Sequence, residues 1–63
     1  MDRIKEQRVQ AYYKRTFAYY YDKLGSKVEA LKWAEAACDS FERLGMPPDM
    51  NAMRELILHL KAS

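Results

Sequence analysis

Apolar side chains recur at helical spacing in the first third of the chain. Five of them follow one another at steps of four, four, three and four residues, which places them on one face at 100° per residue. They are Val9, Tyr13, Phe17, Tyr20 and Leu24. The pattern predicts a helix over about residues 3–24 that packs into the core through this face.

Two further stretches show the same periodicity, and each has a charged side opposite its apolar face. The apolar face of residues 27–44 contains Ala30, Leu31, Ala34, Ala37, Cys38, Phe41 and Leu44. The apolar face of residues 49–61 contains Met50, Met53, Leu56, Ile57 and Leu60. Since no strand-like alternation accompanies these patterns, we predict one all-α domain over residues 1–63. It is either a three-helix bundle or an αα-hairpin with a third helix.

Glycine and proline mark the ends of these helices. Gly25 and Gly45 follow the last apolar position of the first and second helices, where a left-handed residue commonly ends a helix. Ser26, with Glu29 three residues later, predicts a capping box at the start of the second helix. Two prolines stop the second helix, and Asp49 is expected to cap the third helix or to lie in its first turn.

Small residues line the apolar face of the second helix at positions 30, 34 and 37, all of them alanine. A neighbouring backbone can approach closely there, and large rings can fill the remaining space at native packing density. We therefore expect Tyr13, Phe17 and Tyr20 of the first helix to pack against these alanines, with the tyrosine hydroxyls at an edge of the core.

The hairpin of the first two predicted helices resembles one tetratricopeptide repeat. Residues 17–37 carry features of that family at matching spacing. These are the large-then-small pair Phe17-Ala18, the aromatic Tyr21, the turn residue Gly25 and the second-helix alanines Ala30 and Ala37. The resemblance implies a tight helix-turn-helix and covers about a third of the chain. Glu42 stands where the family has a proline, so the second helix is expected to continue to Leu44.

The size of the chain limits the core that it can form. A domain of 63 residues buries only about 60% of its unfolded surface, so its packing is usually supplemented by a cross-link, a metal or a partner. Cys38 is the only cysteine and His59 the only histidine, which excludes an internal disulfide and leaves no ligand set for structural zinc. Good helix packing and association with a partner remain as the sources of stability, and a homodimer is a serious possibility.

The sequence contains no segment typical of membrane insertion. No apolar run approaches 18 residues, and the N-terminal sequence MDRIKEQRVQ is charged rather than signal-like. A lone cysteine fits a compartment in which thiols stay reduced. We expect a cytoplasmic protein without a membrane partner.

Residues suited to catalysis are few. Cys38 lies on the apolar face of its helix, where a thiol is usually inert, and His59 lies at the margin of the third apolar face. The acidic row Glu35, Asp39 and Glu42 is typical of a solvated helix side, and both glycines end helices instead of forming a phosphate-binding loop. We expect no enzyme activity, no cofactor, no metal and no small-molecule substrate.

Cations and tyrosines alternate along one flank of the first helix. Residues 1–25 carry six basic side chains against three acidic ones, although the net charge of the chain is only +2. The row, which we call the basic stripe, consists of Lys5, Arg8, Tyr12, Arg15, Tyr19 and Lys23, at steps of three or four. Either rings and cations stack on one another on a solvated face, or they form a recognition surface, since tyrosine and arginine are enriched at binding hot spots. Trp33, at the border of the second apolar face, either caps the core edge or anchors a partner.

These patterns favour a binding function. We expect a small, non-enzymatic helical interaction module, an adaptor or inhibitor of the size that viral and mobile genomes encode. It would bind a protein partner, another protein or a second copy, through the basic stripe and Trp33. The alternative is a nucleic-acid-binding accessory protein, with the cations on phosphates and the rings on exposed bases. An isoelectric point near 8.8 and an acidic second helix favour the protein partner, since dedicated DNA-binding domains are more basic.

Overall fold

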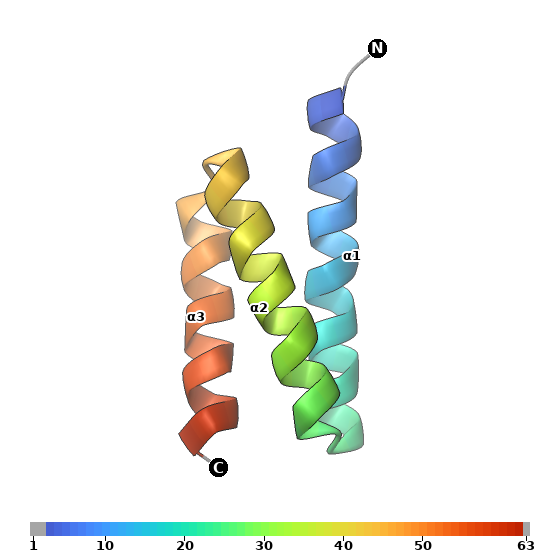
Figure 1. Cartoon of the computed structure of the whole chain (residues 1–63), viewed down its shortest axis with the longest axis vertical. Helices are drawn as coiled ribbons and strands as arrows, with labels where there is room; N and C mark the ends of the chain where they lie inside the picture. The colour runs from blue at the N-terminus through green and yellow to red at the C-terminus, as the bar shows by residue number, and fades with distance from the viewer. Residues whose placement is uncertain (1–2, 63) are drawn as a thin grey trace.

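Three α-helices make up the part of the chain that the structure describes. The computed structural model describes residues 3–62, with side chains from residue 5 onward. The helices are α1 (Arg3–Leu24), α2 (Lys27–Leu44) and α3 (Pro47–Ala62), as Figure 1 shows. No strand occurs in this range, so the predicted all-α architecture of three helices is confirmed.

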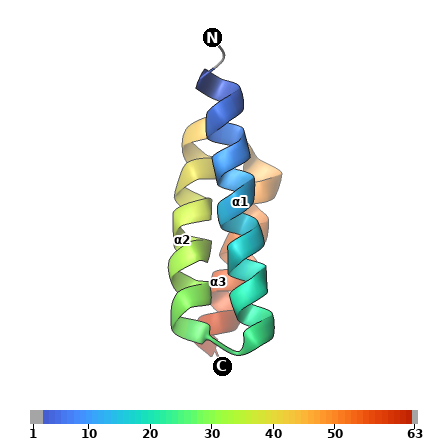
Figure 2. The ribbon, with the colours of Figure 1, turned by 90° about the vertical axis from the view of Figure 1, so that its right-hand side faces the viewer.

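The central helix is α2. It packs against both neighbours, whereas the backbones of α1 and α3 make little contact with each other. In Figure 1, α2 runs obliquely, close to α1 at the α1–α2 turn and close to α3 at the α2–α3 turn. Figure 2, turned by 90°, shows α2 to one side of α1 and α3. The Cα atoms span 41 × 19 × 13 Å, an elongated shape that reflects the 22 residues of α1.

Glycines end α1 and α2 as predicted. Gly25 and Gly45 have φ angles of +81° and +67°, in the left-handed region that residues with a Cβ rarely adopt. At the first turn the Ser26 N–H donates to the Tyr21 carbonyl at 3.0 Å, and the turn at Gly45 repeats this geometry. Both turns are Schellman motifs, which satisfy carbonyls that the helix end would otherwise leave unpaired.

The predicted capping box at the start of α2 is wrong. The Ser26 side chain makes no capping hydrogen bond, and its φ of −87° and ψ of 77° lie outside the extended conformation usual for this position. In a capping box, Glu29 would accept a hydrogen bond from the Ser26 N–H. That N–H already donates to Tyr21 in the preceding turn, because a two-residue connection makes one residue serve both helix ends.

The third helix begins two residues earlier than predicted, at Pro47 rather than at residue 49. Both prolines lie in the first turn, where N–H groups have no partner within the helix, so the missing donor of proline is harmless there. Asp49 lies in this first turn, as predicted. The Met50 N–H donates to the Met46 carbonyl at 3.0 Å and starts the helical hydrogen bonds.

The core combines small side chains of α1 and α2 with larger ones of α2 and α3. Its buried residues are Ala11, Ala18, Ala30, Ala34, Ala37, Phe41, Met53, Leu56 and Leu60. The half-buried side chains around them include Leu31, Cys38, Leu44, Met50 and Ile57. The apolar faces predicted for the second and third helices are therefore confirmed.

The prediction that one face of α1 packs into the core through its large apolar side chains is wrong. These side chains are exposed, and we call the row that they form the outer seam. Val9, Tyr13, Phe17, Tyr20 and Leu24 are 43%, 62%, 42%, 54% and 58% exposed, respectively. The buried side of α1 carries Ala11 and Ala18 instead. Tyr20 follows Ala18 by two residues, or about 200° of rotation, so their side chains point to opposite sides of the helix.

Close approach of the α1 and α2 backbones explains this correction. Alanines from both helices belong to one buried cluster, and alanine is small enough to let two backbones come close. A ring at position 18 would hold the helices apart, whereas a ring on the outer side needs no space between them. The volume of the core is supplied by Phe41 and Met53, both fully buried.

Two substitutions in α1 should differ clearly in their effect on stability. Ala18→Leu forces a larger side chain into the α1–α2 contact and should lower the free energy of unfolding by about 1–3 kcal/mol. Tyr20→Ala removes an exposed ring and should change this free energy by less than about 1 kcal/mol. Urea denaturation followed by circular dichroism measures both changes. A loss of about 3–5 kcal/mol for Tyr20→Ala, typical of truncating a buried ring, would contradict this core.

Candidate functional site

The basic stripe forms one continuous flank of α1. Because the helix is unbroken over Arg3–Leu24, steps of three and four residues bring its members into line. Five of them are exposed: Lys5, Arg8, Tyr12, Tyr19 and Lys23. The sixth, Arg15, is half-buried.

The middle of the basic stripe ties α1 to α3. The Arg15 guanidinium lies 4.9 Å from the centroid of the Tyr12 ring, and its Nη1 donates to Asp49 Oδ1 at 3.2 Å. The Tyr12 ring meets the buried Phe41 ring edge-on, with 5.7 Å between the centroids. This part of the stripe therefore stacks on the protein itself, and its cation already has a carboxylate partner.

The outer seam borders the basic stripe on the surface of α1. Of the nine large apolar residues exposed in the described chain, seven lie on this helix. Single exposed apolar side chains are ordinary, but a contiguous row of them indicates an interaction site. Sequence reasoning missed this surface because it assigned the row to the core. The signal that could have revealed it is the seven-residue spacing of Ala11 and Ala18, which matches that of Ala30 and Ala37.

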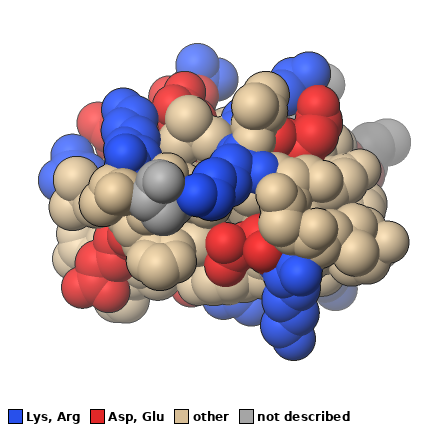
Figure 3. Space-filling model, turned by 90° about the horizontal axis from the view of Figure 1, so that it is seen from below, with Lys and Arg blue, Asp and Glu red and all other residues tan. Residues whose placement is uncertain are grey.

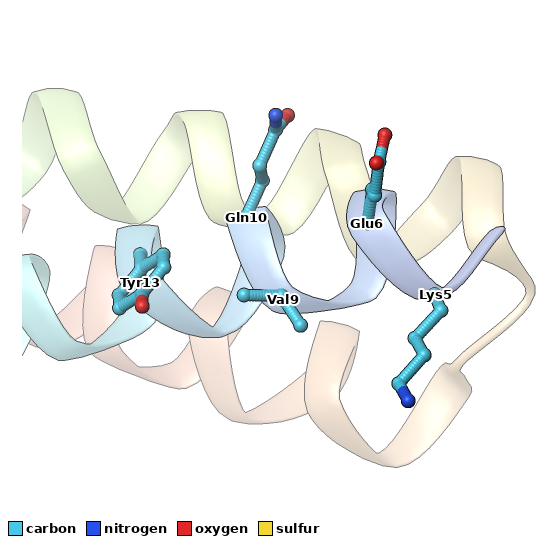
Figure 4. Close-up of a pocket in the computed structure, with 5 residues that line it drawn as sticks. All are labelled: Lys5, Glu6, Val9, Gln10 and Tyr13. Atoms are coloured by element: carbon cyan, nitrogen blue, oxygen red, sulfur yellow. The ribbon is translucent and has the colours of Figure 1, made fainter. Parts of the chain in front are cut away.

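Two shallow hollows are lined by residues of α1 alone. The first is shown in Figure 4 and is lined by Lys5, Glu6, Val9, Gln10 and Tyr13. In this view Val9 lies between Tyr13 and Lys5, and Glu6 and Gln10 point the other way. The second hollow is lined by Arg15, Thr16, Tyr19, Tyr20 and Lys23. Since a single helix lines each hollow, both are depressions between neighbouring side chains rather than enclosed cavities.

Trp33 links the core edge to the outer seam. Its half-buried side chain packs against the core, and its ring lies 5.0 Å from the Phe17 ring, centroid to centroid. It therefore occupies the first of its two predicted positions, at the core edge. It also extends the apolar surface of the seam towards α2. A hydrogen bond also joins α1 to α2, since Lys14 Nζ donates to Ser40 Oγ at 3.0 Å.

The residues considered for catalysis make structural or solvent contacts. Cys38 is half-buried, with its Sγ 3.9 Å from the Met50 carbonyl oxygen, and His59 is exposed on α3. The acidic row on α2 is exposed, and its middle member Asp39 pairs with Arg43 at 3.2 Å. Within residues 3–62, no group of three His, Cys, Asp or Glu side chains could hold a metal ion.

Charge is mixed where α1 turns into α2. Figure 3 views the molecule from this end and shows lysines and arginines interspersed with acidic side chains. A broad area without charged side chains lies on the α1 side of this view. This uncharged area is thus bordered by charges of both signs at this end of the molecule.

Comparisons with known proteins give no indication of function, so function is inferred from the surface of α1. No protein-family model, curated protein or solved structure matches the chain. The resemblance of residues 17–37 to a tetratricopeptide repeat is therefore one of hairpin geometry. Among the helices described, none is both long and apolar enough to cross a membrane.

The tie between α1 and α3 can be measured by a double-mutant cycle. Arg15→Met and Asp49→Asn should show a coupling energy of about 0.2–1 kcal/mol in urea denaturation, the range for partly exposed ion pairs. The coupling should shrink at high salt, because solvent ions screen the pair. Arg54→Met, on the exposed side of α3, serves as the control and should show no coupling to Asp49→Asn. Equal coupling for Arg15 and Arg54 would mean that the tie does not form in solution.

Proposed function

We propose that the protein is a non-enzymatic interaction module that binds a protein partner through the outward surface of α1. The observation that carries the proposal is the outer seam, a row of five large apolar side chains left uncovered by the fold. Burying apolar surface is favourable by about 25 cal/mol per Å². Aromatic side chains are also the usual anchors of protein interfaces.

The basic stripe supplies the polar border of this interface. Protein interfaces commonly combine an apolar centre with a charged, solvent-accessible rim. Lys5, Arg8 and Lys23 are exposed beside the outer seam and fit such a rim. The Trp33 ring extends the apolar centre towards α2 through its contact with Phe17.

The two faces of α1 have different tasks in this proposal. The alanine face holds the helix in the fold, and the outer seam recognises the partner. A small domain that presents one helix in this way suits an adaptor or an inhibitor, whose role is to join or to cover the surfaces of other proteins. We place this activity in the cytoplasm, where the half-buried thiol of Cys38 stays reduced.

Nucleic acid is the second candidate ligand, because three exposed cations, Lys5, Arg8 and Lys23, share one flank of α1 with Tyr19. Contacts from Lys5, Arg8 and Lys23 to phosphates would make the affinity fall about 20- to 40-fold between 50 and 200 mM salt. An apolar protein interface should hold over the same range. Mobility shifts with single-stranded and duplex fragments at 50 mM salt test this candidate, and the absence of binding removes it.

The protein interface predicts that two charges in the outer seam abolish partner binding. The double variant Tyr13→Glu and Tyr20→Glu should recover at least tenfold less partner than the unchanged chain in a tagged pull-down from the native host. The reason is that binding would bury unpaired carboxylates. Quantitative mass spectrometry measures the recovery.

A matched variant separates this effect from general charge. Lys32→Glu, on the outer side of α2, lowers the net charge by two units as the seam variant does, and it should leave recovery unchanged. Circular dichroism establishes that both variants keep their helices. If the seam variant recovers the same proteins in the same amounts as the unchanged chain, α1 is not the binding surface.

A further inference from the structure

We infer, on the basis of the proposed function, that the partner lays an acidic amphipathic helix along the outer seam of α1. Three features of the described residues carry this inference. They are the spacing of the seam, the two hollows beside it and the sign of the charges that border it.

The spacing of the seam is that of a helix–helix contact. Tyr13, Phe17, Tyr20 and Leu24 follow one another at steps of four, three and four residues. This is the repeat by which two helices keep their apolar rows in register over successive turns. A strand or an extended peptide has a side-chain period of two and could not follow the row. The occupant that matches the seam is therefore a helix.

The two hollows have the form of sites that receive side chains from a neighbouring helix. Each is framed by residues three or four positions apart on α1, as are the holes into which knobs pack in helix pairs. Their centres are about ten residues apart, which is about 15 Å along the axis. The first contains Tyr13 of the seam, and the second contains Tyr20 together with Tyr19 of the basic stripe. A partner helix that fills both would cross α1 obliquely, as packed helices usually do.

The charges beside the seam call for an acidic partner. Between residues 5 and 24 the described side chains include two acids: Glu6, which lines the first hollow beside Lys5, and Asp22, which is half-buried on the same side of α1 as Ala18. Five basic side chains outnumber them: Lys5, Arg8, Lys14, Arg15 and Lys23. Lys14 and Lys23 flank the seam on its two sides. Charges that flank an apolar helix seam select partners of opposite sign.

The same charges disfavour a second copy of this chain as the occupant. Two α1 helices packed seam to seam would bring two net-positive surfaces together, each with five basic side chains against Glu6 and Asp22 between residues 5 and 24. Like charges in an interface raise its free energy and are a common means of excluding a partner. We therefore assign the seam to a different protein.

Site-specific photo-crosslinking tests the chemistry of the occupant. The full chain carries p-benzoylphenylalanine in place of Tyr20, beside the second hollow, and is irradiated in lysate of the native host. Mass spectrometry then reads the sequence of the crosslinked segment. We expect an amphipathic helical sequence with an excess of Asp and Glu at its flanking positions. The same amino acid in place of Lys32, on the outer side of α2, is the control and should not crosslink this segment.

Any crosslinked product other than an acidic amphipathic helix contradicts the inference. A crosslink to a second copy, to nucleic acid or to lipid would overturn it, as would a protein segment that is basic, neutral or non-helical. If the seam variant of the pull-down loses its partner while the crosslinked segment is not acidic, the proposed function holds and only the acidic helix is wrong. If no protein crosslinks at position 20, both the interface and the acidic helix are wrong.

Charge reversal measures the electrostatic part of the contact once the crosslinked segment is known. Lys23→Glu should weaken binding of that segment, as a synthetic peptide, about three- to tenfold, because an attraction at the rim becomes a repulsion. Lys32→Glu makes the same change away from the seam and should leave the affinity unchanged. Equal affinities for the unchanged chain and Lys23→Glu would contradict an acidic partner.

Discussion

The close contact of alanines between α1 and α2 determines most of what this molecule presents to its surroundings. Ala11 and Ala18 are buried in the same cluster as Ala30, Ala34 and Ala37. The alanines and the large apolar side chains lie on opposite sides of α1. Packing the alanines against α2 therefore leaves the large side chains exposed to solvent. The exposed outer seam is thus a geometric consequence of close packing, and any sequence with this alanine pairing would expose whatever stands opposite.

This packing also links binding to stability. Alanine contacts bury little apolar area, so the core depends on a few larger side chains of α2 and α3, such as Phe41 and Met53. The inner face of α1 adds mainly close packing, and Arg15 adds one ion pair to α3. A partner that covered the outer seam, as we propose, would bind only the folded chain and would stabilise it by mass action.

Helix boundaries could be predicted from the sequence because local chemistry sets them. Gly25 and Gly45 end their helices through backbone conformations that depend on a few neighbouring residues. The faces of α2 and α3 could also be predicted, since each has only one apolar side. The face of α1 could not, because both of its sides are apolar and the larger rings outweigh the alanines in any count of hydrophobicity. Likewise, the contact of Arg15 with Asp49 joins residues 34 positions apart, and spacing along one helix carries no information about it.

The distribution of charge supports our proposal of a different protein over self-association. Three of the nine acids of the chain lie on the outer side of α2, at Glu35, Asp39 and Glu42, away from the outer seam. A second copy that offered this side to α1 would leave its own seam open for a third copy. Such head-to-tail contacts continue into open assemblies unless their rotation closes a ring. The partner that we propose, with an acidic helix, would cover the seam once and would end the assembly there.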